Sequence, residues 1–139
     1  MPDSVRKVEH FSTRVPNRPG AAFKVLSTLV SAKVNLLACT GIPRGRQAQI
    51  DVVPEDATRF RVAVKKAGLV FAPKRTGFMI QGNDRPGALA ENLAKLAKRG
   101  INVTAIDALT AGNGRWGAIL WVTPEDVARA ARALRAKAM

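Results

Sequence analysis

The chain has 139 residues, of which 47% are hydrophobic, with a formal net charge of +13, one cysteine and one histidine. No apolar run approaches the roughly 20 residues of a membrane span, the first residues carry no signal peptide, and a single cysteine excludes an internal disulfide. One histidine argues against a metal cluster, and we expect a cytoplasmic protein without cofactors. The positive charge bears on partners and solubility rather than on fold.

The first elements predicted along the chain are a strand over Val5–Val15 and a helix that runs to about Ala32. Between them lies the corner Asn17-Arg18-Pro19-Gly20-Ala21. Asn17 is interpreted as the helix N-cap, because its side chain can accept an N–H of the first turn. Proline suits that first turn, where no backbone donor is needed. The corner is therefore predicted to turn a strand into a helix and to expose backbone N–H groups.

The next segments complete a first module. Strands are predicted over Val34–Thr40 and Gln47–Val53, and a helix opens at Pro54 and stops at Gly68. Leu69–Phe71 is predicted to be a short fourth strand. This order, βαββαβ, is the ferredoxin-like plan of an antiparallel sheet with two helices on one face.

A second module follows the same order. Strands are predicted over Arg75–Gln81, Ile101–Leu109 and Arg115–Val122. One helix is predicted by the helical spacing of Leu89, Leu93 and Leu96 and ends at Gly100, and a last helix runs from Pro124 to the C-terminus. No fourth strand follows that helix, so we expect seven strands, four helices and an open sheet edge. Bare edges are usually covered, either by a second chain or by the extra residues Met1–Ser4.

The corner of the first module returns 67 positions later as Asp84-Arg85-Pro86-Gly87-Ala88. Over Asn17–Ala38 against Asp84–Ala105, eight of 22 positions are identical, where chance would give about one or two. The sequence thus predicts an α+β protein of two tandem ferredoxin-like modules, residues 1–74 and 75–139, the second without its last strand.

The chain resembles the ACT domain in the order of three features. The corner motif, Asn or Asp followed by Arg-Pro-Gly-Ala, precedes an apolar helix, and a strand then starts with Val34-Asn35-Leu36 or Ile101-Asn102-Val103. The resemblance covers nearly the whole chain, twice. It implies a regulatory module that binds small molecules, most often amino acids, and that catalyses nothing itself. It also implies that the ligand lies against the corner and often at a seam between modules, which points to fourteen residues: Asn17, Arg18, Pro19, Gly20, Ala21, Asn35, Leu36, Asp84, Arg85, Pro86, Gly87, Ala88, Asn102 and Val103.

The chemistry of the two corners supports such a ligand independently. A zwitterionic amino acid needs an anion site and a cation site close together, and helix N-terminal amides supply the first. Asp84 could supply the second, whereas Asn17 could only form hydrogen bonds, so tighter ammonium recognition is expected at the second corner. The alternative interpretation is that Asn17 and Asp84 serve only as N-caps.

The sequence therefore favours a non-enzymatic sensor that binds an amino acid or a similar small anion and acts as a homodimer. A regulatory subunit of a separate amino-acid biosynthetic enzyme fits the same features. The alternative from another class is a nucleic-acid-binding protein, since a basic ferredoxin-like sheet could bind phosphates, although aromatic residues that stack on bases are few. Basic residues on the two later helices are expected to form a solvated face, with an acidic protein as a possible partner.

Overall fold

The computed structural model describes residues 2–138, which form two compact units. We call residues 9–75 the inner unit and residues 2–8 together with 76–138 the outer unit. The two names refer only to the order along the sequence, in which the first unit interrupts the second. The first strand, β1 (Ser4–Pro16), is divided between them. The division of the sequence into modules 1–74 and 75–139 stays a prediction; in space, residues 2–8 belong with the second half of the chain.

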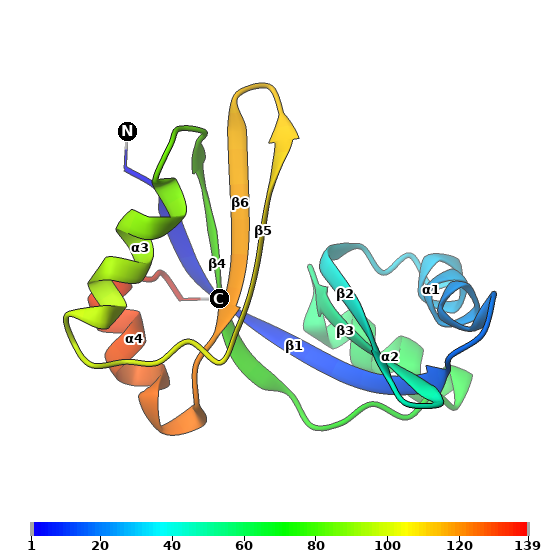
Figure 1. Ribbon diagram of the computed structural model, residues 1–139. Helices are drawn as coiled ribbons and strands as arrows, with labels where there is room; N and C mark the ends of the chain where they lie inside the picture. Colours follow the sequence, from blue (N-terminus) through cyan, green and yellow to red (C-terminus); the bar gives the residue numbers. More distant parts are fainter. Residues whose placement is uncertain (1, 139) are drawn as a thin grey trace. The chain divides into compact units, whose positions relative to one another are not determined.

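The inner unit is an antiparallel sheet covered by two helices. Its strands lie in the order β2 (Leu36–Arg44), β3 (Gln47–Pro54) and the second part of β1. The helices α1 (Ala21–Ser31) and α2 (Ala57–Ala67) pack against each other and cover one face (Figure 1). The core between the layers is apolar and includes the fully buried Leu29, Val52 and Phe60.

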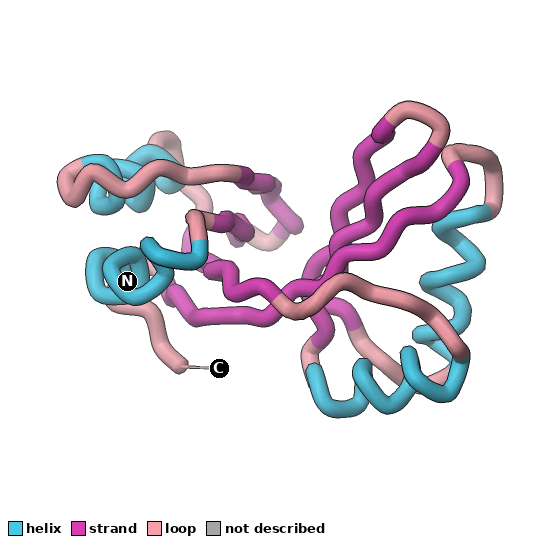
Figure 2. The backbone as a smooth tube through the Cα atoms, turned by 90° about the horizontal axis from the view of Figure 1, so that it is seen from below, coloured by secondary structure: helices cyan, strands magenta, loops and turns pink. Residues whose placement is uncertain are grey.

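The outer unit repeats this plan with β4 (Arg75–Asn83), α3 (Ala88–Ala97), β5 (Ala105–Gly112), β6 (Arg115–Trp121) and α4 (Val127–Leu134). The first residues of β1 lie beside β4, and β6 and β5 follow. A 3₁₀ turn, Pro124–Asp126, precedes α4. Figure 2 shows the helices of each unit on one side of its strands. The predicted fold class, with antiparallel sheets and helices on one face, is confirmed.

The number of strands is six among the described residues, not seven. Leu69–Phe71 is not a strand, and the prediction of one there is wrong. This segment runs beside β1 with two hydrogen bonds, from Ala72 N–H to the Ser12 carbonyl at 2.8 Å and from Thr13 Oγ1 to the Val70 carbonyl at 2.7 Å. Pro73 follows directly and has no N–H to extend a ladder, which ends the pairing.

The open edge predicted for the second module is covered by the chain itself. Residues 4–8 of β1 occupy the place beside β4 where a fourth strand would lie. On the other side of β1, Lys137 exchanges 2.9 Å backbone bonds with Lys7 and Val5. Residues Met1–Ser4 were predicted to cover this edge. Of these, Ser4 is the first residue of β1, and Met1 lies outside the described residues. Most of the covering strand consists of residues after Ser4.

The last helix does not run to the C-terminus as predicted. It ends at Leu134, because Arg135 takes a left-handed conformation with φ 54° that turns the chain back toward β1. The strands after α1 and α3 also start later than predicted. Leu36 is the first residue of β2, and Asn102 and Val103 precede β5.

Candidate functional site

The two corners have nearly the same backbone. Each helix has a glycine N-cap in the left-handed region, Gly20 with φ 85° and Gly87 with φ 82°, and neither helix has a side-chain cap. The N-cap interpretation of Asn17 and Asp84 is therefore wrong. These residues start the corner instead: the Asn17 N–H donates to the Arg46 carbonyl at 3.0 Å, and the Asp84 N–H to the Gly114 carbonyl at 2.8 Å.

A glycine cap leaves the first helical turn without a side-chain acceptor. Among the described residues, no hydrogen bond reaches the N–H groups of Ala22 and Phe23 in α1, or of Leu89 and Ala90 in α3. Such N–H groups carry the positive end of the helix dipole and favour an anion. Both corners therefore offer backbone donors of the kind that bind a carboxylate or phosphate.

The first corner is open to solvent and basic. Asn17, Arg18, Pro19 and Gly20 are all exposed. Within residues 2–138 the Arg18 side chain makes no hydrogen bond or ion pair, and Lys24 of the first helical turn adds a second cation. This corner keeps an unpaired guanidinium beside free amides, an arrangement that can accept an anion from solution.

The second corner is closed by a carboxylate of the same chain. The Arg85 Nη1 and Nη2 atoms each lie 3.1 Å from one oxygen of Asp3. Asn92 Nδ2 donates to Asp3 Oδ2 at 2.9 Å, and Trp116 Nε1 to Oδ1 at 3.3 Å. Arg85 also donates to Glu91 at 2.6 Å. The Asp3 side chain is only 5% exposed as a result.

Charge and burial compete at Asp3. Burial raises the pKa of the Asp3 carboxyl, but the hydrogen bonds from Arg85, Asn92 and Trp116 outweigh burial, so its pKa lies below the ordinary value. The hydrogen bonds to Asp3 and then to Glu91 raise the pKa of Arg85. Asp3 is therefore an anion at neutral pH, held by an arginine that stays charged.

Arg85 was predicted from the sequence as a site residue, but its partners Asp3, Asn92 and Trp116 were not. Asn92 carries a weak signal, because it is polar at a position where the repeat has Val25. Asp3 carries none, since it lies 82 positions before Arg85. Of the other predicted residues, Leu36 and Val103 are half-buried against the two cores, and Asn35 donates to Glu55 at 3.3 Å. Asn102 is exposed.

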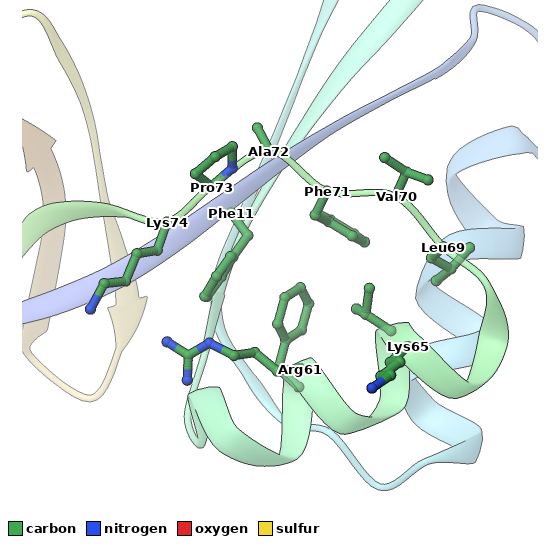
Figure 3. Close-up of a pocket in the computed structure, with 11 residues that line it drawn as sticks. Phe11, Arg61, Lys65, Leu69, Val70, Phe71, Ala72, Pro73 and Lys74 are labelled. Atoms are coloured by element: carbon green, nitrogen blue, oxygen red, sulfur yellow. The ribbon is translucent and has the colours of Figure 1, made fainter.

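A separate pocket of about 590 Å³ lies in the inner unit, away from the corner residues. Figure 3 shows the rings of Phe11 and Phe71 directed into it, with Arg61, Lys65 and Lys74 around the rim. Glu9 neutralises two of these cations, with Arg61 at 2.9 Å and Lys74 at 3.0 Å. The pocket lies beneath residues 69–74, which include the segment 69–71 where the predicted strand does not form, and it suits an apolar group.

Comparisons with known proteins bear on the second corner. The ACT domain family matches residues 78–137. This part of the chain is therefore similar to the ACT domain. The matched range contains the corner Asp84–Ala88 together with Asn92 and Trp116. No curated protein sequence matches the chain.

Solved structures agree on the fold. Protein BT0572 from Bacteroides thetaiotaomicron is 20% identical, with a TM-score of 0.79 over 94% of this chain and 88% of that one. The ligand-free regulatory subunit of aspartate kinase from Thermus thermophilus is 19% identical, with a TM-score of 0.65 over 97% of this chain and 95% of that one. At such identities the similarity establishes the fold alone.

Among residues 2–138, no three histidine, cysteine or acidic side chains gather closely enough to hold a metal ion. Within the same residues, no helix has the length and apolar character to cross a bilayer.

Proposed function

We propose that the chain is a non-catalytic sensor whose two tandem ACT-like modules bind a small molecule, an amino acid, at their strand–helix corners. The observation that carries this proposal is the pair of glycine-capped helices, each with first-turn amides that no side chain caps. The ACT domain at residues 78–137 supports it for the second corner, and the repeated motif extends it to the first.

The proposed ligand contacts are those of the two corners and of the segments that precede the next strands. At the first corner the ligand carboxylate would meet the amides of α1 and the free guanidinium of Arg18. At the second, Asp84 is exposed and is the proposed partner of an ammonium group. The full proposed set is Asn17–Ala21, Asn35, Leu36, Asp84–Ala88, Asn102 and Val103.

A thermal-shift screen of the twenty amino acids and common nucleotides, followed by calorimetry, tests the proposal. We expect at least one amino acid to raise the melting temperature, because a ligand that binds only the folded state stabilises it. Arg18→Met should weaken that binding about tenfold or more, and Arg59→Met, an exposed arginine of α2, is the control for the loss of one charge. Absence of any shift, or equal losses in the two variants, would contradict the proposal.

Calorimetry on Asp84→Ala and Asn17→Ala tests the proposed ammonium contact. The loss of affinity should be greater for Asp84→Ala, because a carboxylate binds an ammonium more strongly than an amide does. Equal losses would remove Asp84 from the proposed set.

We also infer a homodimer. The strand β5 lies at the edge of the outer unit's sheet, and seven of its eight residues are exposed, including Leu109. Exposed edges of this kind are usually paired or covered. A second copy pairing along β5 would make the ligand-dependent assembly typical of a regulatory subunit. Sedimentation with and without the identified amino acid measures this, and a monomer in both conditions would exclude the dimer.

A further inference from the structure

The side chains that hold Asp3 have the geometry of a carboxylate-binding site. Arg85 meets both oxygens of one carboxylate with its two terminal nitrogens, 3.1 Å each, which is the bidentate arrangement that recognises carboxylates most strongly. Asn92 from α3 and Trp116 from β6 donate to the same group. Three elements of the outer unit thus direct donors at a single position.

Space for the carboxylate is provided by a glycine. Gly82 of β4 is buried, and a Cβ added there would overlap Asp3 Oδ1 and come within 3.2 Å of Trp116 Nε1. The missing side chain of Gly82 is therefore the volume that the carboxylate fills. Any larger residue at this position would close the site.

The donors cannot be left without an acceptor. Asn92 is 1% exposed and Trp116 is 6% exposed, so water does not readily replace a lost partner. Leaving a buried donor unpaired is strongly unfavourable. The site therefore favours a hydrogen-bond acceptor, which in this structure is the carboxylate of Asp3.

One buried atom of the site is not satisfied by Asp3. Asn92 Oδ1 is buried and has no hydrogen-bond partner among the described residues, while its Nδ2 serves Asp3 and the Ala88 carbonyl. Ionised Asp3 is only an acceptor and can give nothing to this oxygen. A ligand with an N–H donor next to its carboxylate would satisfy both, which is the chemistry of an α-amino acid.

We propose that Arg85, Asn92 and Trp116, together with the space at Gly82, form a binding site for the carboxylate of a small amino acid, and that Asp3 occupies this site as a built-in competitor. The proposal rests on the proposed sensor function and identifies how its second corner is controlled. A ligand that enters displaces Asp3. Because Asp3 directly precedes β1, displacement also releases the start of the strand that covers the edge of β4.

The test uses Asp3→Ala in the full chain, with sodium acetate and glycine as probes and sodium chloride at equal ionic strength as the control for the +13 charge. Both probes should raise the melting temperature of Asp3→Ala more than that of the wild type, and glycine more than acetate. Glycine should bind Asp3→Ala about tenfold or more tightly than wild type, because an intramolecular competitor acts at an effective concentration in the millimolar range.

Two double variants define the site. Asp3→Ala with Arg85→Met should lose the response to both probes because the bidentate donor is gone. Asp3→Ala with Gly82→Ala should lose it because the added methyl group fills the carboxylate space. If Asp3→Ala responds to acetate and glycine no more than the wild type does, the proposal is overturned.

A second variant keeps the test decisive if Asp3→Ala does not fold. Asp3→Asn retains the size of the side chain and removes its charge, so glycine should bind it more tightly than wild type, and an unchanged affinity would overturn the proposal.

The sensor proposal and the competitor proposal can fail independently of each other. Loss of amino-acid binding in Arg18→Met reports on the first corner, whereas the gain in the Asp3 variants reports only on the second.

Discussion

The two corners of this chain share a backbone and differ in chemistry. Both have an Arg-Pro-Gly-Ala run, a left-handed glycine cap and uncapped first-turn amides. Among residues 2–138, the arginine of the first corner has no hydrogen-bond or ion-pair partner, whereas that of the second binds a carboxylate of the same chain. The local motif therefore determines the course of the backbone, while residues outside the motif decide whether the site is open or filled.

Three equivalent positions account for this difference. The repeat places Val15 where the second module has Gly82, Lys24 where it has Glu91, and Val25 where it has Asn92. In the first module these residues supply two apolar side chains and a cation. In the second they supply space, an acid for Arg85 and a buried donor. These exchanges adapt the second corner to an internal carboxylate.

The largest expected effect comes from the cores, which should respond alike where the corners do not. Leu29 in α1 and Leu96 in α3 are equivalent in the repeat and are 1% and 0% exposed. Replacing either with alanine removes buried methyl groups and leaves a cavity, at about 3 kcal/mol of unfolding free energy. Urea unfolding followed by circular dichroism measures both losses. A loss below about 1 kcal/mol at only one position would mean that the two cores are not equivalent.

The next effect tests the shared backbone of the corners. Gly20→Ala and Gly87→Ala each force a side chain into the left-handed region, although an added Cβ would meet nothing within 4 Å at either site. The strain should be about 1 kcal/mol in each variant, since it arises from the backbone and not from a clash. Equal losses in urea unfolding would support equivalent corners. A much smaller loss at one of them would indicate that its cap relaxes into another conformation.

The order of elements was predictable from the sequence because its signals are local. Gly68, for example, was identified as the end of α2, and it caps that helix with φ 69°. The corner motif was found by its repetition. Helix ends and corners depend mainly on adjacent residues in the sequence. Their backbone conformation can therefore be predicted from a single segment.

What the sequence did not reveal depends on long-range pairing. The strand expected over Leu69–Phe71 fails because Pro73 ends its pairing with β1, and β1 serves both units. Asp3 reaches the second corner because the first residues of β1 pair beside β4 in the other half of the chain. No local pattern records that a residue near the start of the chain meets Arg85, so the filled state of the second corner could not be predicted.

The smallest expected effect concerns pH and applies to the second corner alone. Although burial raises the pKa of Asp3, its hydrogen bonds lower it below the ordinary value, so the ionised form favours the folded state. The resulting stability is present above the unfolded pKa of about 3.9 and is lost as the pH falls through the lower folded pKa. Asp3→Asn should therefore flatten the dependence of unfolding free energy on pH below about pH 4. Asp84→Asn removes the same charge from an exposed side chain of the same corner and is the matched control. Both variants could change the pH dependence of the unfolding free energy below about pH 4 by the same amount. In that case the ion pair between Asp3 and Arg85 would add no stability to the second corner beyond that of an exposed carboxylate.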